Sequence, residues 1–295
     1  MLGAFLILAL ILVYTLQSLT CKIYTDNYPG DGSVTSAVFC VVSGVIVAIA
    51  TFVFAGFGFS AQPLTILLGV VNAIVLTGYN VGFVGASARG SYSVLMTSLL
   101  AGGILIPTLV GVIGFGDRPG LFKYVALVLV IISAYLVNSR KEEGGTKNSL
   151  LFYILCVILF VCNGAYGSIL DVQQRLTGVS EKEELIILTY GLMAVGMFIY
   201  MLISRKGKTF GDFKQTPKSC LFLLLCSLIV AAAINLLSFL IRYIDDISML
   251  YTFDNAGVLL FSVVFSVVLF KEKLSVKNTV GVLLMTAGLI MAAIF

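Results

Sequence analysis

The sequence predicts an all-α membrane protein of ten transmembrane helices, arranged as two inverted five-helix repeats. Three observations lead to this prediction. Hydrophobic residues make up 60% of the chain and charged residues 11%, whereas a soluble domain carries about 25% charged residues. Several apolar runs are long enough to cross a bilayer. The two halves also share a pattern of residues at a spacing of 155 positions.

The apolar runs define the predicted spans, which are separated by short polar loops. They cover residues 2–20, 34–56, 62–84, 92–114, 120–138, 150–170, 185–203, 219–241, 247–270 and 275–295. The first run lacks the basic start and the small-residue cleavage site of a signal peptide, so we interpret it as a span. The polar segment 141–149 divides the chain into a first repeat, residues 1–140, and a second repeat, residues 150–295.

The repeat is clearest when Asn80–Leu136 is aligned with Asn235–Met291. Eleven of the 57 aligned positions are identical, and the order of the shared features is kept without a gap. The matched positions include Asn80 and Asn235, Thr97 and Thr252, Ala101–Gly102 and Ala256–Gly257, Phe115 and Phe270, and the acid–base pairs Asp117–Arg118 and Glu272–Lys273. Because each repeat holds an odd number of spans, the two repeats cross the membrane in opposite directions.

Composition argues against several kinds of site. The chain has no histidine, which removes His-dependent catalysis and the commonest metal ligand. Its six cysteines lie in or beside the spans without CxxC spacing, so we interpret them as small apolar residues of the helix packing. An intramembrane enzyme needs paired acids, a nucleophile with its base, or metal ligands. We therefore expect no catalytic residue, no metal site and no cofactor. The net charge of +4 comes from loop residues, so we expect no nucleic-acid partner.

Asp254 is an acidic residue that lies well inside an apolar run. A carboxylate within a bilayer is costly unless it is paired, protonated or hydrated. Tyr251, Asp254 and Asn255 follow helical spacing and form one polar stripe, whereas the aligned positions 96, 99 and 100 of the first repeat carry Met or Leu. Asp254 is therefore a candidate for binding a proton or a cationic ligand. The alternative is a structural acid that is hydrogen-bonded to a neighbouring Asn, Tyr or Thr.

Further polar side chains lie inside other spans. Asn72 and Tyr79 are seven positions apart and share a helical face, and Asn163 and Tyr166 are three apart on another. Gln17 carries an amide near the end of the first span, where it either bonds a neighbouring helix or contacts a ligand. The candidate substrate-binding residues are Gln17, Asn72, Tyr79, Thr97, Asn163, Tyr166, Tyr251, Asp254 and Asn255, with Asp254 as the candidate for proton coupling.

The loops carry most of the charge. Of the 18 Lys and Arg residues, 13 fall in the loops that follow the first, third, fifth, seventh and ninth spans or within three residues of them. The positive-inside rule then places these loops in the cytoplasm and both termini outside. Asp171–Glu184 is rich in charged residues, and we expect it to be a solvated loop.

Certain residues give the chain a resemblance to a known family. They are Asn235–Leu237, Arg242–Tyr243, Phe270–Lys273, Leu274, Gly281 and Gly288 in the second half, with Pro107 and Phe115–Arg118 in the first. With these residues the chain resembles the drug/metabolite transporter superfamily, in particular its EamA-type members with ten helices. The first half departs from the pattern, because Asp117–Arg118 is followed by Pro119 and replaces a Glu-Arg corner. Motifs of the nucleotide-sugar and sugar-phosphate branches are missing, which leaves the subfamily open.

The resemblance implies five plus five helices around a central cavity, alternating access, and a substrate near the third, fourth, eighth and ninth spans. It commonly implies cytoplasmic termini, in contrast to the charge distribution. We predict a secondary active transporter, with export as the expected direction, for a small polar or amphipathic metabolite. The alternatives are a flippase for a lipid-linked substrate and a non-transporting membrane receptor or assembly protein. We expect a monomer or homodimer in the cell (inner or plasma) membrane, with a small-molecule substrate and the lipid bilayer as partners.

Overall fold

The computed structural model describes residues 2–28, 32–118, 120–138, 149–177, 181–204, 216–241, 247–271 and 275–294. Within these ranges the chain forms ten helices and no strand. They are α1 (Leu2–Asn27), α2 (Gly32–Phe54), α3 (Pro63–Ser87), α4 (Tyr92–Phe115), α5 (Leu121–Asn138), α6 (Leu150–Thr177), α7 (Lys182–Ser204), α8 (Pro217–Ile241), α9 (Ile247–Val268) and α10 (Val276–Ile294).

Local sequence explains several helix ends. Pro63 and Pro217 each begin a helix, where the missing N–H of proline costs little because the first turn has no partner for it. Gly116 ends α4 with a φ of 69° and donates its N–H to the Gly111 carbonyl. A left-handed residue in this position satisfies a carbonyl of the last turn, and glycine adopts that conformation without strain.

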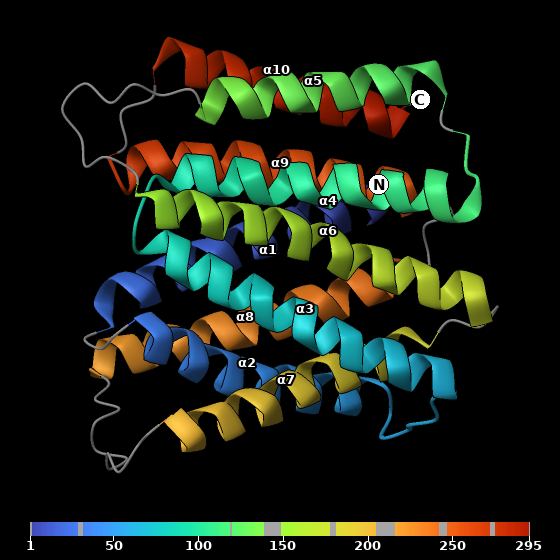
Figure 1. Ribbon diagram of the computed structural model, residues 1–295, viewed down its shortest axis with the longest axis vertical. Coiled ribbons are helices and arrows are strands. Elements are labelled where there is room, and N and C mark those ends of the chain that lie inside the picture. The colour runs from blue at the N-terminus through green and yellow to red at the C-terminus, as the bar shows by residue number, and fades with distance from the viewer. Residues whose placement is uncertain are drawn as a thin grey trace.

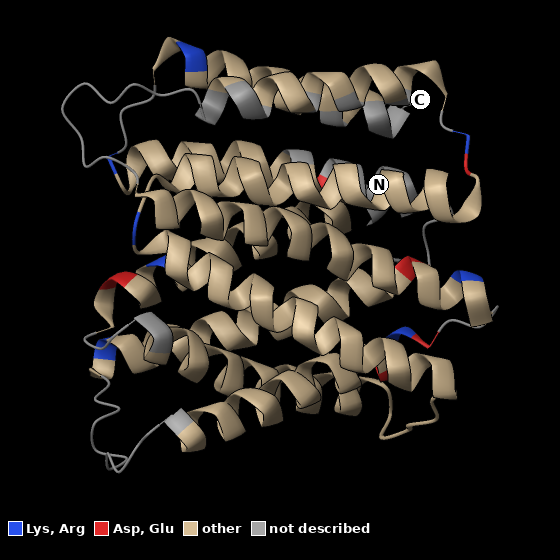
Figure 2. Cartoon of the chain, viewed as in Figure 1, with Lys and Arg blue, Asp and Glu red and all other residues tan. Residues whose placement is uncertain are grey.

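The helices have the composition of a multi-pass membrane protein. In the part of the chain that the structure describes, seven helices are long and apolar enough to cross a membrane: α1, α2, α3, α4, α6, α7 and α8. Large apolar side chains such as Ile113 and Val276 are at least 80% exposed, which suits contact with lipid rather than with water. Charged residues gather at the two ends of the helices (Figure 2). The prediction of an all-α membrane protein is confirmed at this level.

The prediction for Asp171–Glu184 is wrong in part. Asp171 to Thr177 continue α6, and α7 already begins at Lys182. Gln173 is fully buried, and its amide nitrogen donates to the hydroxyl oxygens of Thr65, at 3.1 Å, and Thr177, at 3.2 Å. Buried polar groups need such partners. Gln173 therefore joins the extended end of α6 to Thr65 of α3. Similarly, α1 runs on to Asn27 rather than ending at residue 20.

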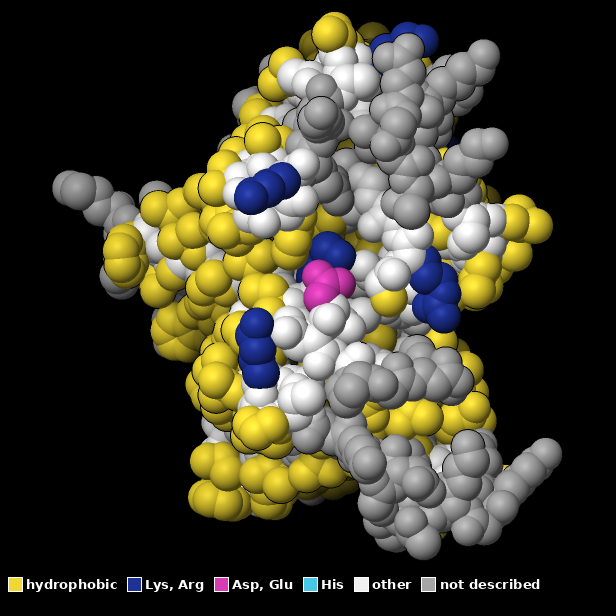
Figure 3. All heavy atoms as spheres, turned by 90° about the vertical axis from the view of Figure 1, so that its left-hand side faces the viewer, with side chains coloured by type: hydrophobic (Ala, Val, Ile, Leu, Met, Phe, Trp, Pro, Cys, Tyr) yellow, Lys and Arg dark blue, Asp and Glu magenta, His cyan; other side chains and the backbone are white. Residues whose placement is uncertain are grey.

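The helices pack as an ordered stack. Figure 1 shows the α5–α10 pair at one end of the molecule and the α2–α7 pair at the other. Between them α1 packs on α8 and α9, while α6 packs on α3 and α4. In addition α2 packs on α8 and α7 on α3. The odd-numbered helices α1, α3, α5, α7 and α9 all end on one side of the molecule, on the left of Figure 1. That face carries Lys and Arg side chains, and apolar atoms cover much of its flanks (Figure 3).

Glycines let two pairs of helices approach closely. A Cβ on Gly102 of α4 would overlap the backbone carbonyl group of Phe160 in α6, and a Cβ on Gly164 would overlap the Gly102 carbonyl in return. A Cβ on Gly257 of α9 would lie 2.6 Å from the Ile11 side chain of α1. Small residues at helix crossings allow the backbones to pack tightly in membranes, so the repeated Ala-Gly marks equivalent crossings in the two halves.

Candidate functional site

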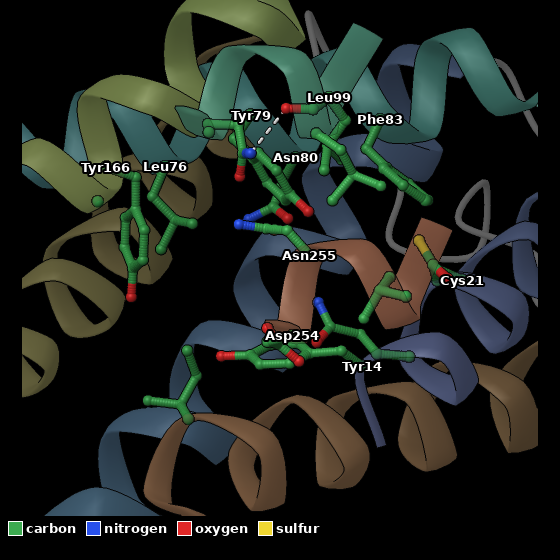
Figure 4. Close-up of a pocket in the computed structure, with 18 of the residues that line it drawn as sticks. Tyr14, Cys21, Leu76, Tyr79, Asn80, Phe83, Leu99, Tyr166, Asp254 and Asn255 are labelled. Carbon is green, nitrogen blue, oxygen red and sulfur yellow. Dashed lines mark hydrogen bonds between the residues drawn. The ribbon is translucent and has the colours of Figure 1, made fainter. Parts of the chain in front are cut away.

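A cavity of about 170 Å³ lies among the helices of both halves. Its described lining comes from α1, α2, α3, α4, α6, α7, α8 and α9, and none of it from the α5–α10 pair. The volume is comparable to that of a cavity that holds a benzene-sized ligand, about 150 Å³. The side chains of Tyr14, Tyr79, Asn80, Asp254 and Asn255 point into this space (Figure 4).

Most of the predicted site residues line this cavity. Tyr79 of α3, Asn163 and Tyr166 of α6, and Asp254 and Asn255 of α9 all do so, as does Gln17 of α1. They come from four helices that are far apart in the sequence. The structure shows that these six residues line one cavity, whereas their role in substrate binding stays a prediction.

Three predicted residues are placed differently. Asn72 is buried, and its amide nitrogen donates to the Thr189 hydroxyl of α7 at 3.3 Å. Thr97 is fully buried, and its hydroxyl donates to the Ser93 carbonyl one turn earlier in α4. Neither residue lines the cavity; both serve helix packing here. Tyr251 belongs to α9, but its side chain lies outside the described residues.

Asp254 and Gln17 have buried acceptor atoms that no described residue satisfies. Within the described residues, neither Asp254 Oδ1 nor Gln17 Oε1 has a hydrogen-bond partner, and Asp254 is 6% exposed. Buried polar atoms in proteins are nearly always hydrogen-bonded. Among the described residues, Oδ1 therefore has no bond to a neighbouring Asn, Tyr or Thr.

The aligned stripes of α4 and α9 both face the cavity. Met96, Leu99 and Leu100 line it from α4, while Asp254 and Asn255 line it from α9. One half therefore contributes an apolar wall and the other a polar wall at matching positions. Tyr166 and Tyr79 add aromatic rings with hydroxyl groups on neighbouring helices.

Sequence reasoning missed several cavity residues. Tyr14, Phe39, Phe83 and Tyr190 contribute further aromatic rings, and Asn80 contributes an amide. Tyr14 precedes Gln17 by three positions and so shares its helical face, a signal that could have identified it. Phe39 and Tyr190 carry no such signal, because their helices reach the cavity through packing between the two halves.

Two cation–aromatic contacts lie at opposite sides of the molecule. On one side Lys22 Nζ donates to the Ser87 carbonyl at 2.9 Å, and it lies 5.0 Å from the Phe270 ring centroid. On the other side the Arg175 guanidinium lies 4.8 Å from the Phe115 ring centroid and 3.0 Å from Asp117 Oδ1. The Lys22 side chain is 11% exposed and that of Arg175 is 37% exposed, so the Lys22 contact is the more deeply buried of the two.

Comparisons place the fold among known structures. No protein-family model matches the chain, and no curated protein matches its sequence. In fold, 27 chains of solved structures match it. One is a protein of known crystal structure that is 14% identical, with a TM-score of 0.62 over 98% of this chain and 97% of that one. At this identity the likeness shows the fold alone.

Proposed function

We propose that this protein is a secondary active transporter that moves a small polar or amphipathic metabolite by alternating access. The observation that carries the proposal is the cavity between the two halves, with a buried carboxylate in its wall whose Oδ1 has no partner among the described residues. Ligand sites between helices of a bundle are typically apolar with a few polar groups that orient the ligand. The proposal includes ten membrane-spanning helices in two inverted repeats, as in EamA-type drug/metabolite transporters, and a location in the cell membrane.

The packing of the helices supports the inverted repeat. Each main packing pair has an equivalent pair when the helices of the first half are exchanged with their counterparts in the second. The α1–α8 pair corresponds to α6–α3, and the α1–α9 pair corresponds to α6–α4. The aligned asparagines agree with this exchange: the Asn80 amide donates to Met193 in α7, and the Asn235 amide donates to Thr51 in α2. Duplicated halves of this kind can rock against each other around a fixed site.

The two cation–aromatic contacts occupy corresponding places in the two halves and fit a role in gating. Phe115 and Phe270 are aligned positions of the repeats, and each lies under a cation from the first helix of one half, Arg175 of α6 or Lys22 of α1. A buried cation on an aromatic ring contributes about 2 kcal/mol when it is desolvated. Both contacts are formed in this conformation. We infer that each contact helps to hold its own side closed and that opening a side breaks its contact.

A labelling experiment tests alternating access without knowledge of the substrate. Gly167 lines the cavity, and a Cβ added there meets no atom within 4 Å. In a variant without native cysteines, Gly167→Cys is expected to react with a membrane-impermeant maleimide from either side of a proteoliposome. The matched control is Gly196→Cys on the exposed face of α7, which should stay unlabelled because lipid covers it. Labelling of Gly167→Cys from one side alone under all conditions would contradict transport and favour a receptor or assembly protein.

Proton coupling through Asp254 makes a separate prediction. The carboxylate binds a proton when the cavity is open to the acidic side of the membrane and releases it when the cavity is open to the alkaline side. A pH gradient should therefore drive flux. Asp254→Asn keeps the shape but cannot exchange a proton, so flux in proteoliposomes should lose its dependence on the pH gradient. The tyrosines and Cys21 of the cavity ordinarily titrate at about pH 8.5 or above, outside the range of the assay. Unchanged pH dependence in the variant would show that another group couples transport.

A further inference from the structure

The cavity presents acceptors to its ligand and no positive charge. Asp254 Oδ1 and Gln17 Oε1 are buried acceptors without a partner among the described residues. Of the Lys and Arg residues that the structure describes, none lines the cavity. The nearest in sequence to a lining residue is Lys22, whose Nζ already bonds the Ser87 carbonyl and lies 3.3 Å from Asp26. A ligand that completes this site must therefore supply hydrogen-bond donors and tolerate a carboxylate.

The backbone of α4 adds a third acceptor. Pro107 lies inside α4 and has no N–H to donate to the carbonyl of the residue four positions earlier. That residue is Gly103, which lines the cavity. Glycine at this position leaves room for the Asn163 side chain, because a Cβ there would lie 2.7 Å from the Asn163 amide nitrogen. The Asn163 amide nitrogen in turn donates to the Leu99 carbonyl of α4 at 2.8 Å, which fixes this side chain against α4.

Aromatic rings surround these acceptors. Tyr14, Phe39, Tyr79 and Phe83 belong to α1, α2 and α3, and Tyr166 and Tyr190 to α6 and α7. The faces of aromatic rings attract cations, and rings of this kind form the binding sites of ammonium groups. The same rings provide an apolar surface for a hydrocarbon or aromatic portion of the ligand. An anion would meet the opposite conditions, since it would face a carboxylate and several acceptors.

We propose that the ligand is a small organic amine in its protonated, monovalent form. Its ammonium group binds Asp254 and donates to the unsatisfied Oε1 of Gln17 and to the Gly103 carbonyl, which receives no N–H from Pro107, and its apolar portion packs among the tyrosine and phenylalanine rings. A primary ammonium has three N–H donors, as the lysine head group does. The cavity volume of about 170 Å³ limits the ligand to roughly the size of one aromatic ring with a short side chain. This inference names the substrate class of the proposed transporter and rests on that function.

Calorimetric titration of the purified protein in detergent tests the inference with three probes of similar size at neutral pH. Phenethylamine is a cation, phenethyl alcohol is its neutral isostere, and hydrocinnamate is an anion of similar length. We expect phenethylamine to bind at least about tenfold more tightly than the alcohol, and hydrocinnamate not to bind. Equal affinities for the amine and the alcohol, tighter binding of the anion, or no binding of the amine would each overturn the inference.

Three variants locate the binding. Asp254→Asn should lower the affinity for phenethylamine about tenfold or more and leave that for the alcohol unchanged. Gln17→Leu should weaken amine binding by a smaller factor. Ser262→Ala is the matched control, because Ser262 Oγ is also buried without a described partner on α9 but does not line the cavity. Amine binding that is insensitive to Asp254→Asn would overturn the assignment.

The outcomes for ligand class and for transport are separable. If phenethylamine fails to bind while Gly167→Cys is labelled from both sides, the ligand class is wrong and the transport proposal stands. If phenethylamine binds through Asp254 while labelling occurs from one side alone, the ligand site stands and transport is wrong.

Discussion

Replacing Gly102 with alanine is expected to destabilise the folded protein by about 3 kcal/mol, near the upper end of the usual cost of overpacking. The added Cβ would overlap the Phe160 carbonyl group of α6. Backbone cannot move aside as a flexible side chain can, so α4 and α6 would have to separate. Since both helices line the cavity, the site would be distorted as well. We expect a lower melting temperature and aggregation on size exclusion.

A graded series of glycines controls this prediction. Gly257→Ala would meet the Ile11 side chain at 2.6 Å, and this flexible neighbour can shift, so a smaller loss is expected. Gly191→Ala meets nothing within 4 Å on α7, and it should be neutral or slightly stabilising because alanine favours helix by about 1 kcal/mol over glycine. In a background that lacks the exposed Cys220 and the half-buried Cys162, a thiol-reactive dye reports unfolding, since Cys21, Cys40, Cys156 and Cys226 are buried. Equal melting temperatures for the Gly102 and Gly191 variants would refute the close crossing.

Filling the cavity is expected to abolish ligand binding without unfolding the protein. Gly167→Leu places an isobutyl group in open space, since a Cβ at Gly167 meets no atom within 4 Å, and the cavity of about 170 Å³ has little room to spare. We expect the affinity for phenethylamine to fall by about 100-fold or more, with an unchanged or higher melting temperature.

The control for this variant is Gly196→Leu, which adds the same group on the lipid-exposed face of α7. It should bind phenethylamine as the unmodified protein does. If Gly167→Leu kept full affinity, the amine site would lie outside this cavity. If its melting temperature fell as far as that of the Gly102 variant, the space around Gly167 would be smaller than the structure indicates.

The sequence could predict the helices because a membrane span depends on local composition. Nine of the ten predicted spans begin within two residues of a helix in the structure; the exception is the seventh, which was placed from residue 185 whereas α7 begins at Lys182. The extension of α6 beyond residue 170 could not be predicted in this way. Gln173 is polar and its burial depends on Thr65 of α3, a partner distant in the sequence.

The candidate site, like the helices, could be predicted from the sequence only in part. Asp254 and Asn255 could be identified from the sequence because a polar stripe in an apolar run is a local signal. Thr97 has the same local appearance, yet its hydroxyl bonds its own helix, and Asn72 bonds α7. Whether a polar side chain satisfies a neighbour or faces a cavity depends on how the helices pack. No spacing rule within one helix contains that information.

The lone carboxylate of the cavity also determines what kind of energy could drive the proposed cycle. Asp254 is the single acidic residue in the described lining, which holds no Lys or Arg. If it carries a proton in one direction and a monovalent ammonium in the other, the loaded site is neutral on both legs. One proton then exchanges for one amine and no net charge crosses the bilayer. Such an exchange is electroneutral, so the concentration gradient of protons would drive it and the membrane voltage would not.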